Sequence, residues 1–224
     1  MCQILIARKN QCLVVNEKEQ DILIGSILGD ACVLKKGMIQ FEHGQKQKEY
    51  LEWKYEQLKP IVSGTKIYEI KRFRDNRTWY YYKFTTRQFF RSWREKFYPY
   101  GVKVISPEVI KNLSPLSLAV WYMDDGCLTS NYSCIISTDA FSADSVENLR
   151  SMLDKKYEIK TRIREKKSYS KTGMKIQQRI YIGGKNMVKF FDLIRSFIIS
   201  SMTYKITDPV TTQSIKRRNI SYLD

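Results

Sequence analysis

The sequence predicts an α+β protein made of two similar halves, each with the element order αββαββα. Three observations support this fold class. Two helices that are apolar on nearly every side run into aspartates, at Asp30 and at Asp125. Short alternating segments that are typical of strands follow each helix. The tetrapeptide YEIK occurs at residues 68–71 and 157–160 and runs on each time into arginines, which indicates an internal repeat.

The first apolar helix begins at a recognisable N-terminal signal. Asn16 and Glu19 have the spacing of a capping box. The run ILIGSILGD follows at residues 22–30, and Gly25 and Gly29 share one helix face because they lie four positions apart. Glycine costs about 1 kcal/mol relative to alanine inside a helix. Two glycines on one face therefore indicate the close approach of another backbone, and a helix that ends early is the alternative.

The rest of the first half alternates between strand-like and helix-like segments. Alternating residues up to Phe41 predict strands, and residues 45–58 predict a helix. An aromatic and β-branched run at residues 79–85 predicts a further strand, and a helix-like stretch follows at residues 86–97. The first half therefore has the expected order αββαββα.

The second half begins at Ser114 and Pro115, a good N-cap residue followed by proline at the first helical position. The apolar helix that follows ends in Asp124 and Asp125. Strands are then expected around residues 127–137 and 174–182, with helices at 142–155 and 185–199. Residues 98–113, with two prolines and one glycine, are the expected join, which divides the chain into halves at residues 1–105 and 106–224.

The charge of the chain indicates a polyanionic partner. Its 224 residues contain 39 Lys+Arg against 23 Asp+Glu, a formal net charge of +16, and 43% hydrophobic residues suffice for a core. Such a cationic body favours nucleic acid or an anionic membrane surface as partner. No apolar run approaches the roughly 18 residues that span a bilayer, and the N-terminus lacks a secretory signal. We therefore expect a nucleic-acid partner and no membrane.

Cysteine and histidine usage restricts the metal chemistry. The five cysteines form no C-x-x-C pair, so zinc fingers are excluded, and we expect reduced, small hydrophobic cysteines. The single histidine, His43, leaves little room for a histidine-rich metal site or an HNH nuclease. Any metal would then be held by carboxylates, which favours a hard cation such as Mg²⁺.

The two aspartates break a local rule in the same way. A helix C-terminus carries partial negative charge and favours cations, yet both apolar helices are expected to end in carboxylate. A repeated violation of this kind indicates a functional site. If the two helices lie side by side, Asp30 and Asp125 bring oxygen ligands together at one end, which suits Mg²⁺ and phosphodiester hydrolysis. A solvated helix end is the alternative for either aspartate alone.

These residues resemble those of a known family. The segments LIGSILGDA, at residues 23–31, and LAVWYMDDG, at residues 118–126, are similar to the motif that names the LAGLIDADG homing endonucleases. Two motifs in one chain resemble the single-chain, pseudo-symmetric members, in particular the yeast mitochondrial intron-encoded ones. The sequence departs from the motif at Val120, where the family has a central glycine, and at Ala31, where it has a final one.

The resemblance implies a fold and a site. The two motif helices pack between the halves, the sheets form a saddle in the DNA major groove, and the chain acts as a monomer. Asp30 and Asp125, at the eighth motif position, would bind the divalent metals, Mg²⁺ or Mn²⁺, and Ca²⁺ would support binding without cleavage. Asp124 occupies the seventh position, which is usually small. A basic residue near each half-site is also implied, and Lys103 and Lys205 match it because each follows the last helix of its half.

The resemblance also implies an activity, the staggered double-strand cleavage of a long DNA site. The rival function is that of a LAGLIDADG maturase or DNA-binding regulator that acts without cleavage, with intron RNA as the partner of a maturase. The expected location is an organelle, either mitochondrion or chloroplast, or a prokaryotic cytoplasm.

Strand alternation selects candidate DNA-reading residues. In the second half, alternate positions from Lys160 to Lys166 are basic, while Ile159 and Ile163 fall on the other face. A two-stranded ribbon fits the major groove, where Arg reads guanine and Gln reads adenine, and some of these side chains would contact only phosphate. The candidates are Gln40, Arg72, Arg74 and Arg77 in the first half and Arg162, Arg164, Gln177 and Arg179 in the second. An ordinary solvated strand face is the alternative.

Two other nuclease patterns are minor alternatives. Residues 181–183 read YIG, which is half of a GIY-YIG signature, but no GIY precedes them. Residues 69–71 and 158–160 both read EIK, which fits the E-x-K of restriction-type nucleases. Neither pattern explains why two apolar helices run into aspartate.

Overall fold

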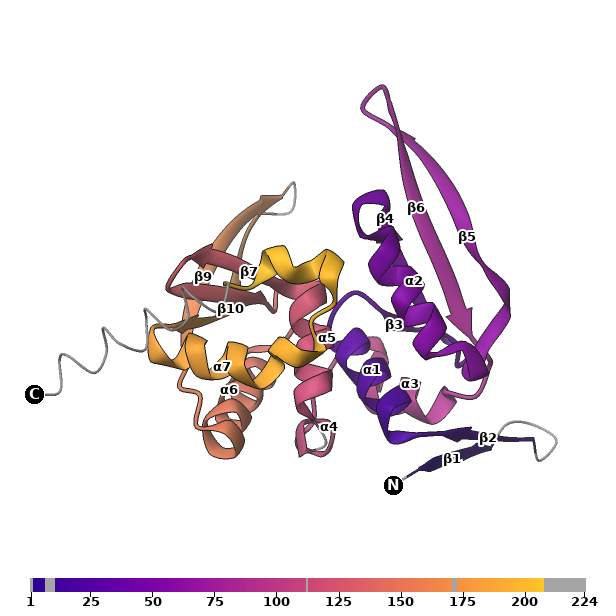
Figure 1. Cartoon of the computed structure of the whole chain (residues 1–224), viewed down its shortest axis with the longest axis horizontal. Coiled ribbons are helices and arrows are strands. Elements are labelled where there is room, and N and C mark those ends of the chain that lie inside the picture. Colours follow the sequence, from indigo (N-terminus) through magenta and orange to yellow (C-terminus); the bar gives the residue numbers. More distant parts are fainter. Residues whose placement is uncertain (1, 7–10, 112, 171–172, 208–224) are drawn as a thin grey trace, which may run out of the picture.

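Two four-stranded antiparallel sheets flank a central pair of adjacent helices, α1 (Glu17–Leu28) and α5 (Pro115–Asp125), in the computed structural model of the chain (Figure 1). The structure describes residues 2–6, 11–111, 113–170 and 173–207. Each central helix opens one half of the molecule, and the two halves have matching topology.

The order of elements is the same in the two halves. In the first, α1 is followed by β3 (Cys32–Val33), β4 (Ile39–Gly44), α2 (Lys48–Gln57), β5 (Val62–Arg74), β6 (Arg77–Thr86) and α3 (Arg91–Phe97). In the second, α5 is followed by β7 (Gly126–Ser130), β8 (Ser133–Ser137), α6 (Ala143–Tyr157), β9 (Arg162–Ser170), β10 (Gly173–Gly183) and α7 (Lys185–Ile194). The sheets have the orders β3-β4-β6-β5 and β7-β8-β10-β9, so the predicted pair of αββαββα halves is confirmed.

Other elements lie before, between and after these. A hairpin of β1 (Gln3–Ile6) and β2 (Cys12–Val15) precedes α1 and was not expected from the sequence. The short helix α4 (Pro107–Lys111) precedes α5, and 3₁₀ segments include η2 (Gln45–Gln47), η4 (Pro99–Gly101), η5 (Arg195–Phe197) and η6 (Ser200–Lys205).

The predicted helix starts are confirmed. Asn16 and Glu19 exchange backbone-to-side-chain hydrogen bonds of 2.9 Å each, which completes the capping box of α1. The Ser114 hydroxyl accepts a 3.1 Å bond from the Ser117 N–H at the start of α5, where Pro115 takes the first helical position. These caps satisfy backbone donors that the first turn of a helix leaves without partners.

The glycine face of α1 contacts α5 directly. A Cβ added at Gly25 would lie 2.4 Å from the Ser117 carbonyl oxygen and 2.8 Å from Val120 Cβ. A Cβ at Gly29 would lie 2.4 Å from Asp124 Cβ. The predicted close approach of a second backbone is therefore confirmed, and Val120 is accommodated because Gly25 lies opposite.

Substituting Gly25 by alanine should destabilise the protein. Alanine improves helix propensity by about 1 kcal/mol, but its methyl group collides with α5. We expect the free energy of unfolding to fall by about 1–3 kcal/mol in chemical denaturation, the usual cost of overpacking a close-packed contact. Gly44→Ala is the matched control, since a Cβ at Gly44 meets nothing within 4 Å. A Gly25→Ala variant more stable than the native chain would contradict the packing.

The expectation that the two copies of YEIK occupy matching places in the two halves needs correction. Residues 68–71 lie inside β5, whereas Tyr157 ends α6, Glu158 adopts a left-handed conformation after it, and β9 starts only at Arg162. The two copies of YEIK therefore occupy different places in their halves. The repeat of the fold is real, but this sequence match is a coincidence and does not align the two halves.

Three expected helix boundaries are also wrong. Helix α1 ends at Leu28, so Asp30 lies in the turn after it, while Asp125 is the last residue of α5. Residues 86–90 are not helical, because Thr86 ends β6 and α3 begins at Arg91. The helix expected at residues 185–199 ends at Ile194, where the backbone tightens into the 3₁₀ segment η5. The physical cause of the first error is Gly29, whose backbone has left the helical conformation.

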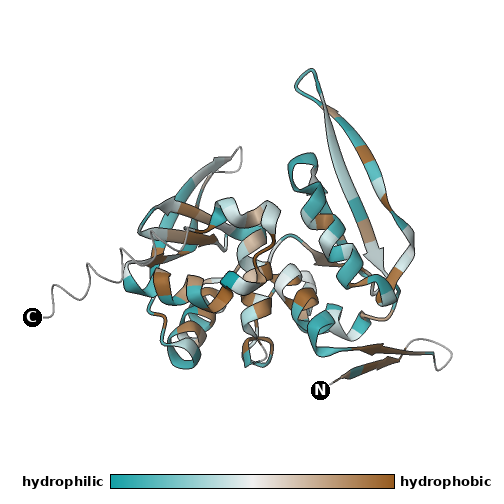
Figure 2. Cartoon of the chain, in the orientation of Figure 1, coloured by the Kyte–Doolittle hydropathy of each residue, from teal (hydrophilic) through white to brown (hydrophobic). Residues whose placement is uncertain are grey.

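The core runs continuously through the central helices. Trp121, Tyr122 and Tyr50 are among the largest fully buried side chains, and Phe41 stacks on Phe84 at 4.5 Å under the first sheet. Figure 2 shows hydrophobic residues in the central helices and along β1 and β2. Among the described residues, no helix combines the length and the apolar character that crossing a membrane requires.

Candidate metal centre and nucleic-acid interface

The two predicted metal-binding aspartates lie at the same end of the central helix pair. Asp30 follows α1 and Asp125 ends α5, and α1 and α5 pack against each other. The Asp30 side chain is 45% exposed, and Asp125 is half-buried. The backbone N–H of Asp30 donates a 3.3 Å hydrogen bond to Asp124 Oδ2, which ties the turn after α1 to the end of α5.

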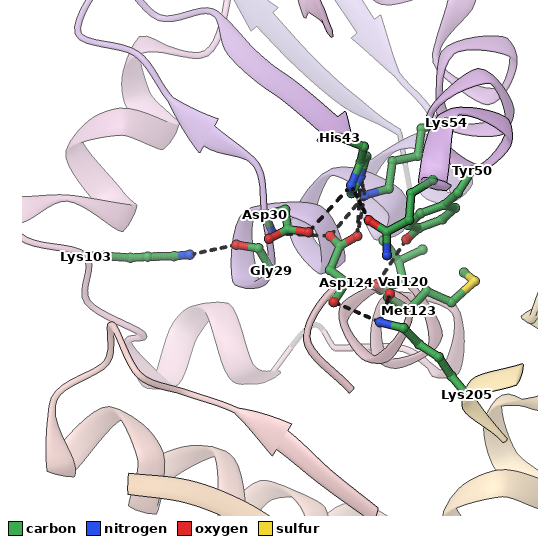
Figure 3. A network of polar contacts seen from close by, with 11 residues as sticks. Gly29, Asp30, His43, Tyr50, Lys54, Lys103, Val120, Met123, Asp124 and Lys205 are labelled. Carbon is green, nitrogen blue, oxygen red and sulfur yellow. Dashed lines mark hydrogen bonds and ion pairs between the residues drawn. The ribbon is translucent and has the colours of Figure 1, made fainter. Parts of the chain in front are cut away.

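Two lysines approach this end of the molecule, one from each half. Lys103 follows η4 and donates to the carbonyl oxygen of Leu28 at 3.1 Å and to that of Gly29 at 3.4 Å. Figure 3 shows the contact with Gly29. Lys205 ends η6 and donates to the carbonyl oxygens of Met123 and Asp124, the second at 3.0 Å (Figure 3). Each ammonium group thus caps the C-terminal turn of one central helix, where cations are favoured.

Burial and neighbouring carboxylates raise the pKa of Asp30 and of Asp125. Burial, with the Asp30 and Asp124 carboxylates, raises the pKa of Asp125 to about 7. Burial and the Asp124 carboxylate likewise raise the pKa of Asp30. Burial lowers the pKa of Lys103 and of Lys205, and the neighbouring carboxylates oppose that effect. The carboxylates therefore repel one another despite the nearby lysines, and a divalent cation would relieve that repulsion.

A buried polar network beside Asp30 was not predicted. Lys54 of α2 donates to both carboxylate oxygens of Asp124, at 2.7 and 3.0 Å, and both side chains are fully buried. Lys54 Nζ also lies 3.2 Å from His43 Nε2. Figure 3 shows His43, Lys54 and Asp124 pointing toward one another. Asp124, at the usually small seventh motif position, is thus the partner of a buried lysine from the first half.

His43 is held as a neutral side chain in this network. Burial and the Lys54 ammonium lower the pKa of His43 to about 3. Its Nδ1 lies 3.1 Å from Gln47 Oε1 and 3.6 Å from Asp30 Oδ2. His43 Nδ1 faces Gln47 and Nε2 faces the Lys54 ammonium, so both ring nitrogens have polar partners, and the expectation that carboxylates would hold a metal stays a prediction.

The donor set fits a hard divalent cation. Asp30, His43 and Asp124 each offer an atom within 4.8 Å of the others. Lys54 already occupies both oxygens of Asp124, which leaves the half-exposed Asp30 as the accessible carboxylate of this cluster. Asp125 supplies a second carboxylate from the other half. Oxygen ligands of this kind suit Mg²⁺ or Mn²⁺, with waters and phosphate oxygens completing the shell.

All four DNA-reading candidates of the first half lie on one face of its sheet. The pairs Gln40–Thr85, Arg72–Trp79 and Arg74–Arg77 alternate with buried Phe41 and Phe84, so the candidates point away from the core. Arg72 is paired with Glu42 at 2.7 Å and lies over the Tyr81 ring at 4.4 Å. Arg74 and Arg77 are exposed at the turn of the β5–β6 hairpin.

The second half presents a corresponding face. The pairs Arg164–Arg179 and Gln177–Lys166 join β9 to β10, and Arg162 pairs with Tyr181 beside them. Arg164 lies over the Tyr181 ring at 4.4 Å. Arg179 donates to both carboxylate oxygens of Asp139, at 2.9 and 2.6 Å, and this contact lowers the pKa of Asp139. Arg164 and Arg162 are exposed, whereas Arg179 has an internal partner.

Two details of the predicted second face are wrong. Lys160 lies before β9, so it is not part of the alternating strand. Ile163 is 37% exposed, because β9 is an edge strand that extends past the core and its apolar side is only partly covered. Arg162, Arg164 and Lys166 share one face of β9 as expected, but the apolar backing under the start of β9 is incomplete.

The minor nuclease patterns fall elsewhere in the fold. Glu69 lies in β5 and accepts a hydrogen bond from Tyr82, and Glu158 follows α6 and pairs with Lys189 at 3.2 Å. The YIG at residues 181–183 forms the end of strand β10. These contacts place none of the three patterns with the two aspartates.

Comparisons with known proteins agree with this architecture. The chain matches the LAGLIDADG DNA endonuclease family over residues 20–190. It is 30% identical to the probable intron-encoded endonuclease 1 of Wickerhamomyces canadensis over 88% of this chain and 87% of that protein. It is 31% identical to the cytochrome b mRNA maturase bI2 of Debaryomyces hansenii, over 83% of this chain and 72% of that protein.

A solved structure shares the fold. The homing endonuclease I-WcaI, determined bound to its DNA recognition sequence, matches with a TM-score of 0.71 and 26% identity. The match covers 86% of this chain and 87% of that one. The paired halves around two central helices are therefore shared with a protein whose structure was determined on DNA.

Proposed function

The chain belongs to the LAGLIDADG DNA endonuclease family, and from this we propose that it is a site-specific homing endonuclease. It binds a long duplex DNA target as a monomer and makes a staggered double-strand break by metal-dependent phosphodiester hydrolysis. We further propose that residues 1–105 and 106–224 each read one half of the target.

One observation carries the proposal. The central helices end together, and each half contributes one aspartate and one lysine to that end: Asp30 and Lys103 come from the first half, and Asp125 and Lys205 come from the second. Double-strand cleavage needs one set of catalytic groups for each strand. The pseudo-symmetric arrangement supplies two such sets within one chain.

Asp30 and Asp125 would hold Mg²⁺ or Mn²⁺ against the two scissile phosphates. When bound, the metal activates water for attack and stabilises the leaving oxygen. Asp30 and Asp125 also place their carboxylates where the cation neutralises their mutual repulsion. Ca²⁺ should support DNA binding without cleavage.

The two lysines have a different role in the proposal. Lys103 and Lys205 are anchored to backbone carbonyls, so each ammonium is fixed at the end of the central helices, within the field of the aspartates. A fixed cation at this place stabilises negative charge that develops on a phosphate during hydrolysis. The strand faces with Arg74, Arg77, Arg162 and Arg164 then position the duplex across both halves.

A maturase role is the second candidate, because a relative with 31% identity is a cytochrome b mRNA maturase. In that case intron RNA is the partner, and the aspartates do not cut. Binding as a DNA regulator without cleavage is the related alternative. Both functions use the basic surfaces but require neither carboxylate.

Cleavage selection from a library of randomised DNA duplexes tests the proposal. With Mg²⁺, sequencing of the cut ends should yield one long asymmetric site with staggered ends, and with Ca²⁺ the same duplex should be bound but not cut. Specific binding without cutting in Mg²⁺ or Mn²⁺ would favour the regulator. Preference for a group I intron transcript over every duplex would favour the maturase.

A further inference from the structure

The two DNA-facing sheet surfaces can be compared position by position. Cys32 and Cys127 each follow a proposed metal ligand by two residues, and they pair with Gln40 and Ile135 respectively. Gln40 pairs in turn with Thr85 of β6, and Ile135 pairs with Tyr181 of β10. Counting outward from these pairs along the strands gives equivalent positions in the two halves.

The outer positions differ in chemistry between the halves. On the first face, Lys83 pairs with Tyr68, Tyr81 with Ile70, and Trp79 with Arg72. On the second face, the equivalent pairs are Arg179 with Arg164, Gln177 with Lys166, and Lys175 with Ser168. Four positions are therefore aromatic or aliphatic in the first half and charged or amide in the second: Tyr68, Ile70, Tyr81 and Trp79 against Arg164, Lys166, Gln177 and Lys175.

The apolar side chains of the first face are accessible. Trp79 and Tyr68 are each 48% exposed. Trp79 and Tyr81 line a hollow of about 280 Å³ together with Arg72 and Arg74, on the face proposed to read DNA. They also border a second hollow of about 660 Å³, which Tyr204 of the other half lines as well. The rings of Trp79 and Tyr81 therefore lie beside arginines on the surface that we propose contacts the DNA bases.

Only one base edge in the major groove offers an apolar group. Thymine presents its 5-methyl group, whereas adenine, guanine and cytosine present hydrogen-bond donors and acceptors. Apolar side chains recognise that methyl group by contact, and arginine and glutamine recognise guanine and adenine by paired hydrogen bonds. The two faces are therefore suited to different base compositions.

We propose that Trp79 and Tyr81 read thymine methyl groups in the half-site bound by residues 1–105. At the equivalent outer positions, the second half-site is read instead through the hydrogen bonds of arginine, lysine and glutamine side chains, whereas its inner positions carry Ile135 and Tyr181. This inference rests on the proposed function, since it assigns the specificity of the same DNA-binding surface. Duplex DNA is the ligand, because the two-stranded β5–β6 ribbon matches the width of its major groove. The deep, narrow major groove of RNA does not admit such a ribbon.

The test replaces thymine by deoxyuracil, which removes the methyl group and leaves the base pairing intact. The duplex obtained by cleavage selection is made in two forms, each with uracil at every thymine in the outer part of one half-site, away from the cleavage position. Affinities are measured by gel shift in Ca²⁺. Uracil in the first half-site should weaken binding about fourfold per contacted methyl group, the factor that corresponds to about 0.8 kcal/mol. Uracil in the second half-site should change binding by less than about twofold, since its contacts are hydrogen bonds.

Variants identify which half-site is which. Trp79→Ala should bind the thymine-containing duplex more weakly than the native chain does. Uracil in the first half-site should then reduce the affinity of Trp79→Ala by a smaller factor than it reduces the affinity of the native chain. Lys175→Ala is the matched control, because Lys175 occupies the equivalent position of the second half and its loss should leave the uracil effect unchanged. Both side chains are exposed near hairpin turns, so neither variant removes a core contact.

The outcomes separate this inference from the proposed function. Equal uracil effects in both half-sites, no effect in the first, or a selected first half-site without any thymine requirement would each overturn it while leaving the nuclease intact. A chain that selects no duplex at all would instead overturn the proposed function. Stronger binding of a group I intron transcript than of the selected duplex would overturn both.

Discussion

Replacing Lys54 by methionine should lower the free energy of unfolding by about 3–5 kcal/mol, the cost of removing one partner of a buried ion pair. The Lys54 and Asp124 side chains are fully buried, 2.7 Å apart, and they join α2 of the first half to α5 of the second. Methionine fills the space of the lysine stem but leaves the Asp124 carboxylate without its cation. Chemical denaturation of the two proteins measures the difference.

Two controls isolate the charge. In the double variant Lys54→Met with Asp124→Asn, the buried charge is gone and the amide oxygen can still accept from the Asp30 N–H, so most of the lost stability should return. Lys59→Met removes an exposed partner of Glu56, a pair 3.0 Å apart, and should change stability by less than about 1 kcal/mol. A Lys54→Met protein as stable as the native chain would show that the pair does not hold the halves together.

Asparagine at Asp30 or at Asp125 should abolish double-strand cleavage while specific DNA binding is kept. Asparagine preserves the shape of the side chain but removes the charge that holds a hard cation. We expect the cleavage rate to fall by at least about a hundredfold, the scale of losing one preorganised electrostatic contact in an active site. Affinity in metal-free buffer should stay equal or rise, because a carboxylate near phosphate repels it.

The measurement is a cleavage assay and a gel shift of each variant on the selected duplex. Asp154→Asn is the control, since Asp154 lies exposed on α6, away from the central helices. If either asparagine variant cuts both strands at the native rate, the helix-terminal aspartates are caps and the metal site lies elsewhere. If both lose binding together with cutting, the aspartates organise the fold.

Local sequence patterns, together with the duplicated motif, predicted most of the fold. Apolar helices, alternating strands and two strong N-caps act within a few residues of one another, so the local sequence determines them. The YEIK match failed because identical letters can serve a strand in one place and a helix end in another. The turn at Gly29 separated Asp30 from its helix for a similar reason: a glycine can leave the helix wherever packing requires it.

The residues of the candidate site that could be predicted are those whose place in the sequence, relative to the two motif segments, marks them. Asp30 and Asp125 stand at the ends of motif segments, and Lys103 and Lys205 follow the last helix of each half. Lys54 could not be predicted, because it reaches Asp124 across 70 positions of sequence and only the packing of α2 on α5 brings them together. His43 joined the same network through strand β4, whose alternation turns it toward the core.

The sequence predicted which side chains lie on the open faces of the two sheets, but not the ion pairs that these side chains form. Alternation correctly put Arg72 and Arg179 on the open faces of their sheets. Glu42 and Asp139, which hold these arginines, lie on other strands or loops and gave no local signal. The contrast between aromatic and cationic halves also emerged only when strand register made equivalent positions comparable.

Electron paramagnetic resonance of Mn²⁺, titrated into the complex of the chain with its selected duplex, tests the central claim most directly. The claim is that Asp30 and Asp125 hold the divalent metals at the DNA. The native complex should bind Mn²⁺, and each of Asp30→Asn and Asp125→Asn should bind fewer ions at the same free concentration, although the duplex stays bound. Undiminished Mn²⁺ binding in both variants would contradict the account.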